Sequence, residues 1–280
     1  MRCLLSICIT LALPMVAHAG APPVQDIRAV QTDSTDVFEV LTILRSAQTA
    51  LANRDYKFAR QGFESVLMHD PNLEIARSGL RRTLIALGDI RSARPLVTDL
   101  ASPDGVIIRI RSGKIEKPEV LLTATLEKKP DPRLWTLLGQ LQDQRGAFSS
   151  ARQSYAMAGL AGARPGLAEN NIGQSHWVAG EHELALTAFE KAAALDPMDE
   201  RFDNNRRRTL VRLGRTQDAI SGLNADRAVM FLAQAADKAV AENEINLARL
   251  LYQKSLEIAP RHNPFTAEKL ARLQQERRHQ

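Results

Sequence analysis

The sequence predicts an all-α fold, a right-handed α-solenoid built from stacked antiparallel helix pairs. Alanine, leucine and arginine dominate the composition while aromatic residues make up only 5%, which favours helices over sheets. Small and aromatic residues recur with a period of 34, which indicates a helical repeat. Glycine and proline stand where that period expects turns. We therefore expect short helices in a stack and no sheet.

The period is clearest between segments 132–165 and 166–199. Five positions match 34 residues apart: Gly139 and Gly173, Gly146 and Gly180, Ala151 and Ala185, Tyr155 and Phe189, and Ala158 and Ala192. Two antiparallel helices approach closely only where side chains are small, and a nearby ring fills the groove that this leaves. The pattern resembles that of the tetratricopeptide repeat (TPR).

The same register extends over most of the chain. It predicts repeats near 40–73, 74–98, 132–165, 166–199, 200–228 and 229–262. Segment 99–131 is interpreted as a degenerate repeat, because Pro118 stands where the second helix expects an alanine. Its β-branched run at 106–110 could instead form a short extended segment. A helix over 264–279 would cap the stack, so that the solenoid spans 38–279.

The N-terminal segment predicts export from the cytoplasm. Arg2 precedes an apolar run over 3–16, and Ala17-His18-Ala19 has the small-x-small pattern of a signal-peptidase site, so 1–19 is expected to be a cleaved signal peptide. Adjacent prolines and several Asp, Thr and Ser residues indicate a disordered leader over 20–37. The expected location is the periplasm, and any contact with the outer membrane is expected to be peripheral.

Both cysteines, Cys3 and Cys8, lie inside the predicted signal peptide. The mature chain would therefore have no thiol for a disulfide, a metal or a nucleophile. Neither cysteine stands where the first mature residue of a lipoprotein would, so lipid anchoring is not expected. No second long apolar run follows, so the mature chain is expected to have no integral membrane segment.

Charge and histidine spacing give no indication of nucleic-acid binding or catalysis. The formal net charge of +5 is mild and does not form the concentrated patch of a nucleic-acid binder. Among the six histidines, His176 and His182 are too far apart in sequence for the paired ligands of one helix face. We therefore expect no enzyme, no metal and no cofactor. An enzyme carried on a helical scaffold stays open, and would need a buried polar cluster with a perturbed titratable group.

The concave face of such a stack is lined chiefly by the first helix of each repeat. In the unit at 132 these positions hold Arg133, Thr136, Gln140 and Gln144. The predicted partner-binding residues come from the next two units: Asn170, Asn171, Gln174, Trp177, Arg201, Asn204, Asn205, Arg208 and Arg212. Amides can bond a peptide backbone and arginines a carboxylate, so an extended or acidic segment of a protein partner is expected. The alternative is a solvated inner face without a ligand.

Asn171 and Arg201 resemble part of the carboxylate clamp of chaperone-binding TPR proteins. Thr136 and Asn205 stand where that clamp has a lysine and a second cation, so capture of a C-terminal carboxylate is not expected.

Three consecutive arginines interrupt the repeat pattern. Arg206, Arg207 and Arg208 stand where the pattern has a leucine and then a small residue. Because burying an unpaired guanidinium is costly, we expect either that this helix rotates or that the charges reach solvent or a partner. A solvated surface is the plainer interpretation, and a functional basic stripe is the alternative.

Segment 166–220 resembles the C-terminal repeats of TadD, the TPR protein of tight-adherence (Flp) pilus assembly. The shared features are the Asn170-Asn171-x-Gly173 opening, the turn Gly180, Asp199-x-Arg201, Asn205 and Leu213-Gly214-Arg215. The resemblance implies a periplasmic scaffold that assists the secretin or another pilus component. TadD proteins are commonly lipoproteins, whereas this chain lacks the required cysteine. The alternative is a general periplasmic adaptor or chaperone, for polysaccharide export or for cell-wall enzymes.

Overall fold

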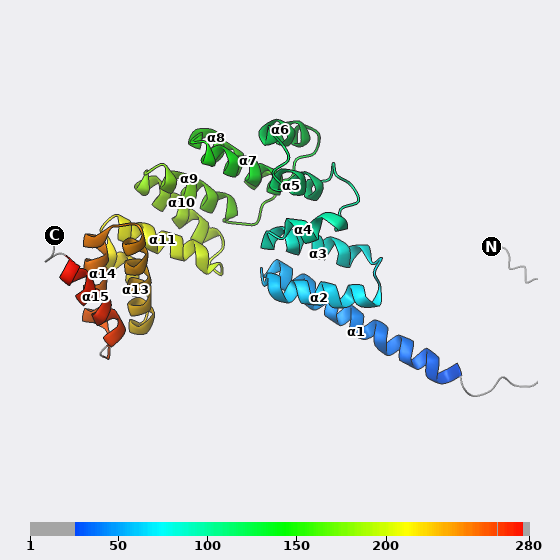
Figure 1. Ribbon diagram of the computed structural model, residues 1–280, viewed down its shortest axis with the longest axis horizontal. Coiled ribbons are helices and arrows are strands. Elements are labelled where there is room, and N and C mark those ends of the chain that lie inside the picture. The colour runs from blue at the N-terminus through cyan, green and yellow to red at the C-terminus, as the bar shows by residue number, and fades with distance from the viewer. Residues whose placement is uncertain (1–25, 262, 277–280) are drawn as a thin grey trace, which may run out of the picture. The chain divides into compact units, whose positions relative to one another are not determined.

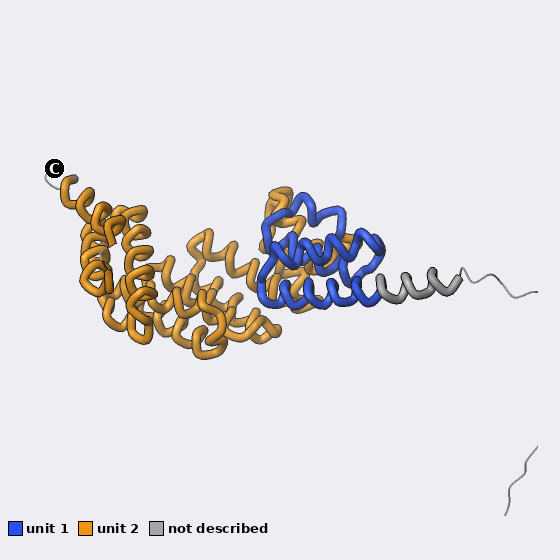
Figure 2. The backbone as a smooth tube through the Cα atoms, turned by 90° about the horizontal axis from the view of Figure 1, so that it is seen from below, with its two compact units in different colours: residues 1–96 blue, residues 97–280 orange. Residues whose placement is uncertain are grey.

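The computed structural model describes residues 26–261 and 263–276, and every regular element among them is a helix (Figure 1). The chain divides into two compact units, 1–96 and 97–280 (Figure 2). In each unit, helices that follow one another along the chain pack side by side, and short loops make such neighbours antiparallel. The predicted all-α fold is confirmed.

The first unit consists of helices joined by tight turns. Its described elements are α1 (Asp26–Ala52), α2 (Tyr56–His69), α3 (Glu74–Leu87), α4 (Ile90–Ala93) and the 3-10 turn η1 (Arg94–Leu96). Helix α2 packs against both α1 and α3. The buried ring of Phe63 faces Gly79 of α3, where an added Cβ would lie 2.3 Å from a ring carbon. The ring therefore fixes how closely α2 and α3 approach.

Helix α1 begins earlier than the sequence analysis expected. The disordered leader was predicted over 20–37, but α1 starts at Asp26; residues 20–25 lie outside the described part. No proline or glycine occurs between Val24 and Gln61, so no residue there breaks the helix. The polar composition that indicated disorder lowers helix propensity without ending the helix.

The second unit contains the longer run of helix pairs. Its described elements are α5 (Pro103–Arg111), α6 (Pro118–Lys128), α7 (Pro132–Gln144), α8 (Phe148–Leu160), α9 (Leu167–Val178), α10 (His182–Leu195), α11 (Glu200–Arg212), α12 (Thr216–Ile220), α13 (Ala225–Ala241), α14 (Ile245–Ile258) and α15 (Pro264–Glu276). The same type of contact, a glycine packed against an aromatic ring, joins α7 to α8 and α9 to α10. A Cβ on Gly139 would lie 2.5 Å from the Tyr155 ring, and one on Gly173 2.7 Å from the Phe189 ring. These are the close approaches that the 34-residue pattern predicts.

The degenerate segment is helical throughout its apolar run. Val106, Ile107, Ile108 and Ile110 are buried on α5, so the extended alternative is wrong. Pro118 begins α6, where its missing N–H costs no hydrogen bond. Arg133 joins this segment to α7, because its guanidinium bonds Asp104 at 2.5 Å and Asp131 at 3.0 Å. Arg133 therefore has a structural role.

The last repeat begins before its predicted boundary at 228/229. Helix α13 starts at Ala225, after Asn224, whose side chain accepts a hydrogen bond from the Arg227 N–H at 2.9 Å. This N-cap fixes the start of the helix. The capping helix α15 packs against α14 and ends its described part at Glu276, with 277–279 outside that part.

Two repeats have a shortened second helix, α4 with the 3-10 turn η1 and α12, and in each an arginine bonds a carbonyl at the end of the helical segment. The Arg81 guanidinium donates to the Leu96 carbonyl at 2.9 Å. The Arg207 guanidinium donates to the carbonyls of Ala219 and Ser221 at 2.6 and 2.9 Å, and bonds Asp203. Arg207 is only 8% exposed, so the expected solvated surface is wrong for this residue. Asp203 and carbonyls that end the short helix compensate its charge in the interior.

Candidate functional site

A polar surface on α9 and α11 brings together most of the predicted partner-binding residues. We call it the inner-face site: Asn170, Asn171, Gln174, Trp177, Asn205 and Arg208. The Asn205 amide donates to the Asn170 side-chain oxygen at 2.7 Å, which joins the two helices. Asn170 and Asn171 make a longer amide contact of 3.5 Å. The spacings along α9 and α11 are three and four residues, which place side chains on one helix face.

The position of α9 is fixed by a hydrogen-bonded network behind the site. Asp143 of α7 accepts from the Tyr155 hydroxyl at 2.8 Å and from the Ser175 hydroxyl of α9 at 2.7 Å. Burial, together with the hydrogen bond to Asp143, raises the pKa of the Tyr155 phenol far above its ordinary value. The phenol therefore stays a donor at any ordinary pH and holds Asp143 in place.

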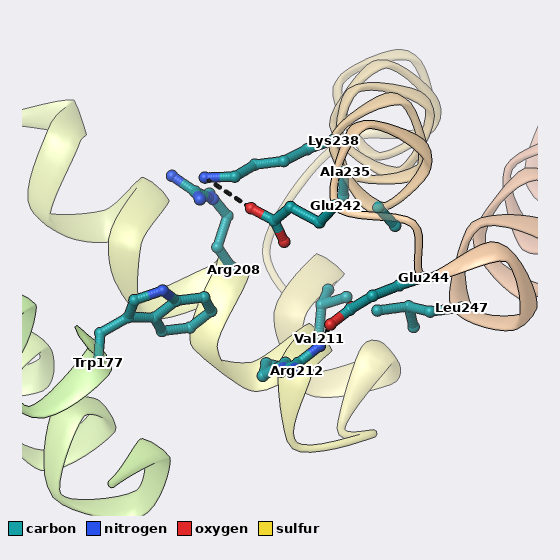
Figure 3. Close-up of a pocket in the computed structure, with 10 residues that line it drawn as sticks. Trp177, Arg208, Val211, Arg212, Ala235, Lys238, Glu242, Glu244 and Leu247 are labelled. Atoms are coloured by element: carbon teal, nitrogen blue, oxygen red, sulfur yellow. Dashed lines mark hydrogen bonds and ion pairs between the residues drawn. The ribbon is translucent and has the colours of Figure 1, made fainter. Parts of the chain in front are cut away.

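Arg208 and Trp177 form the centre of the inner-face site. The guanidinium carbon of Arg208 lies 5.9 Å from the centroid of the Trp177 ring, a cation–π distance. Arg208 makes no ion pair with a residue of the described chain. Its end points into the same space as the end of Lys238 from α13 (Figure 3). Lys238 is 3.5 Å from Glu242, one turn further along its own helix.

Two hollows flank this cation pair. One, of about 90 Å³, is walled by Gln174, Phe189 and Asn205. The other, of about 40 Å³, has an apolar wall formed by Val211, Ala235, Ala239 and Leu247. Both are also lined by Trp177, Arg208 and Lys238, so the two hollows adjoin the same three side chains.

Arg212 lies at the edge of the site and is neutralised there. Its guanidinium pairs with Glu244 and approaches the His182 ring nitrogen at 3.4 Å. The His182 ring lies behind Trp177, with centroids 4.9 Å apart. Arg212 and His182 therefore support the tryptophan, and Arg208 is the cation left for a ligand.

Arg201 and Asn204 lie apart from the inner-face site. Arg201 bonds Asp199 at 2.8 Å, and the Asp199 carboxylate also pairs with Arg164. The Arg201 guanidinium lies over the Phe202 ring. Asn204 lines a separate hollow of about 460 Å³ together with residues of α13. The predicted set is thus divided among three places on or beside α11.

The chain was compared with known proteins. No protein-family model matches it, and no curated protein matches its sequence. A TPR protein from Parabacteroides merdae is 13% identical, with 84% of this chain and 98% of that one aligned and a TM-score of 0.42. A thermophilic TPR protein from Thermus thermophilus is 18% identical, with 84% and 98% aligned and a TM-score of 0.36. Human IFIT1, in its dimer with PPP-AAAA, is 15% identical, with 80% and 61% aligned and a TM-score of 0.53.

The fold is of the tetratricopeptide-repeat type. The assignment rests on the helix pairs of the second unit and on the glycine–ring contacts at Gly139 and Gly173, which recur at the TPR period. Structural likeness at these identities concerns the fold alone, so the ligand of this chain follows from its own residues.

Lys238 is the site residue that the sequence analysis missed. The inner-face positions predicted from the sequence lie in the units at 132, 166 and 200, and Lys238 belongs to the next TPR unit. That unit begins with α13, which has 17 residues and starts at Ala225. An exposed lysine one turn from a glutamate gives no signal that separates it from an ordinary surface pair.

Metal and membrane features were also sought in the described residues. They contain no group of three or more His, Cys, Asp or Glu side chains placed to hold a metal ion. Their helices include none with the length and apolar character that crossing a membrane requires.

Proposed function

We propose that this chain is a periplasmic TPR scaffold that binds protein partners during Flp (tight-adherence) pilus assembly and assists the secretin or another pilus component. The supporting observation is that Asn170, Asn171 and Asn205 belong both to the segment that resembles TadD and to the inner-face site. The residues of the resemblance thus coincide with the side chains best placed to hold a partner.

The size and chemistry of the site favour an extended protein segment over a small molecule. Its hollows, of about 90 and 40 Å³, fall below the roughly 300 Å³ at which ligand pockets begin. Side-chain amides offer both donors and acceptors to a peptide backbone, and Arg208 offers a bidentate donor to a carboxylate. We propose a binding role without catalysis.

Export is part of the proposal and has its own test. The protein should be recovered from the periplasmic fraction with Gly20 as its first residue, because cleavage is expected after Ala19. Recovery in the cytoplasm with Met1 retained would contradict it.

The pilus role is tested by co-purification and by deletion. A tagged protein captured from intact envelopes should bring down secretin or other Flp pilus subunits, and deletion of the gene should reduce piliation. Lack of a cysteine after the signal peptide departs from the lipoproteins common among TadD proteins and favours one alternative, a general periplasmic adaptor. Normal piliation, with capture of polysaccharide-export or cell-wall enzymes in place of secretin, would establish that alternative.

A further inference from the structure

The open cation of the inner-face site indicates what the partner segment carries. Arg208 is half-buried, lies over the Trp177 ring and has no carboxylate partner in the described chain. Stacking on an indole limits the motion of a guanidinium and leaves its edge free for a bidentate contact. The arrangement is therefore suited to a planar carboxylate placed against the exposed edge of Arg208.

Lys238 provides a second cation that can be released at small cost. Its contact with Glu242 measures 3.5 Å, and the two side chains are 44% and 46% exposed. Exposed pairs of this kind are worth about 0–1 kcal/mol, so a ligand carboxylate can replace Glu242 at the ammonium group. Figure 3 shows that Arg208 and Lys238 approach one another from facing helices, with Glu242 beside them. One incoming carboxylate can thus contact both cations.

The surrounding acids argue against a polyanion. Glu242 and Glu244 line the hollow beside Arg208, and Glu244 already neutralises Arg212. A phosphodiester chain would place several negative charges near these carboxylates, and like charges repel. A peptide with a single acidic side chain places one negative charge at the two cations and no further charge near Glu242 and Glu244.

The second hollow adds a preference at a neighbouring position. Val211, Ala235, Ala239 and Leu247 form its apolar wall, and its volume of about 40 Å³ admits only a small side chain. In an extended peptide, residues i and i+2 project to the same side, so one strand can supply both the carboxylate for the two cations and the apolar side chain for this hollow. The hydrogen bond from Asn205 to Asn170 uses one donor and one acceptor site, so the other donor and acceptor sites of these amides can bond the peptide backbone.

We propose that the inner-face site binds an extended protein segment through one Asp or Glu side chain held by Arg208 and Lys238, with a small apolar side chain two positions away in the hollow beside Val211. This inference rests on the proposed scaffold function and names the chemistry of the segment that such a scaffold holds.

The test uses the full mature chain and three synthetic peptides. Each is an eleven-residue Gly/Ser peptide; the first has Glu at its centre and Val two positions later, the second has Gln for Glu, and the third has Trp for Val. Binding is followed by the indole N–H signals in NMR titrations. The sequence contains two tryptophans, so Trp135 serves as an internal control for Trp177. The first peptide should shift the Trp177 signal alone, and the other two should bind at least about tenfold more weakly.

Variants separate specific recognition from general charge. Arg208→Gln should weaken binding of the first peptide by roughly tenfold or more, the usual effect of losing a charge-assisted hydrogen bond. Lys191→Gln removes the same charge from the exposed surface of α10 and should leave binding unchanged. Glu242→Gln frees Lys238 and should tighten binding by up to about fivefold.

Three outcomes would overturn the inference. They are equal binding of the Glu and Gln peptides, equal losses in Arg208→Gln and Lys191→Gln, and tighter binding of a short single-stranded RNA than of the first peptide at the Trp177 signal. If envelope partners are still captured by Arg208→Gln, the scaffold function stands and the partner binds elsewhere. If no envelope protein is captured by the parent chain either, the proposed function fails with it.

Discussion

Arginine replaces a small residue at the eighth position of two units, those predicted to begin at 74 and 200. Arg81 and Arg207 occupy this place, whereas the full-length units at 132 and 166 have Gly139 and Gly173 there. In both arginine units the second helix is short, and the guanidinium reaches a carbonyl at the end of η1, which follows α4, or at the end of α12. The long side chain thus supplies donors to carbonyls that a continuing helix would have bonded internally. The arginine bonds the carbonyls that the short helix leaves without a donor, and these carbonyls stabilise the guanidinium.

Arg207→Met is expected to destabilise the protein by about 1–3 kcal/mol, because it leaves the Ala219 and Ser221 carbonyls without their donor and Asp203 without a buried partner. Thermal unfolding followed by circular dichroism measures the change. Arg208→Met, one residue further along, is the matched control and should leave the midpoint nearly unchanged. Equal midpoints for both variants would show that Arg207 contributes no more to stability than Arg208, which has no ion pair in the described chain.

The half-buried ion pairs also predict how stability depends on pH. Burial raises the pKa of Asp131, but hydrogen bonds and attraction from Arg133 outweigh burial and hold the pKa below its usual range. The pKa of Asp203 is lowered in the same way, by Arg207 and Arg206 acting against burial. Each pair therefore stabilises the fold fully above the unfolded pKa of about 3.9 and loses its effect as pH falls through the lower folded pKa.

We accordingly expect the melting temperature to fall steeply below about pH 4. Asp131→Asn keeps an oxygen that can cap α7 but cannot titrate, so this variant should be less stable at pH 7 and lose less stability on acidification. Parallel curves for the parent and the variant would mean that Asp131 does not contribute to the acid transition.

The helix pair is the element that the sequence predicts best. Gly173 and Phe189 are 16 residues apart, and the contact between them needs only one helix, one turn and the start of the next. Such a local contact requires a glycine and an aromatic residue at a fixed spacing, and this sequence pattern recurs in successive repeats. The burial of Arg207 could not be predicted in this way. The free-energy cost of burying its charge depends on carbonyls at the end of the short helix α12, and no single residue indicates that this helix is short. Lys238 was missed because its approach to Arg208 depends on how two different repeats pack, which the lysine and its neighbour Glu242 do not indicate in the sequence.

Gly173→Ala tests the close approach of α9 and α10. Alanine normally favours a helix over glycine, but the new Cβ would lie 2.7 Å from the Phe189 ring, so we expect a net destabilisation of roughly 1–3 kcal/mol. Gly159→Ala in α8 is the control, because the nearest atom, the Ala168 Cβ, lies 3.2 Å away and small adjustments can relieve the contact. Denaturant unfolding should separate the two variants. A Gly173→Ala protein as stable as its parent would argue against tight packing at this ring.

At the scale of the whole molecule, stability is the sum of contacts between successive helices. Helix α15, the predicted cap, packs against α14. Its Leu273 is 7% exposed within the core formed by α13 and α14, and Lys269 bonds Asp237, which also accepts from the Tyr252 hydroxyl. The predicted cap is thus joined to the final TPR unit by apolar packing and by the ion pair between Lys269 and Asp237.

Leu273→Ala should therefore destabilise the C-terminal end by about 2–5 kcal/mol, the usual range for truncating a buried leucine. Because each helix mainly contacts its neighbours, hydrogen exchange should accelerate in α13 to α15 and change little in α7 and α8. Arg272→Ala, whose side chain is 72% exposed, is the control and should change neither region. If exchange instead accelerates uniformly along the second unit, α15 stabilises the whole stack as one cooperative body and does not act as a local cap.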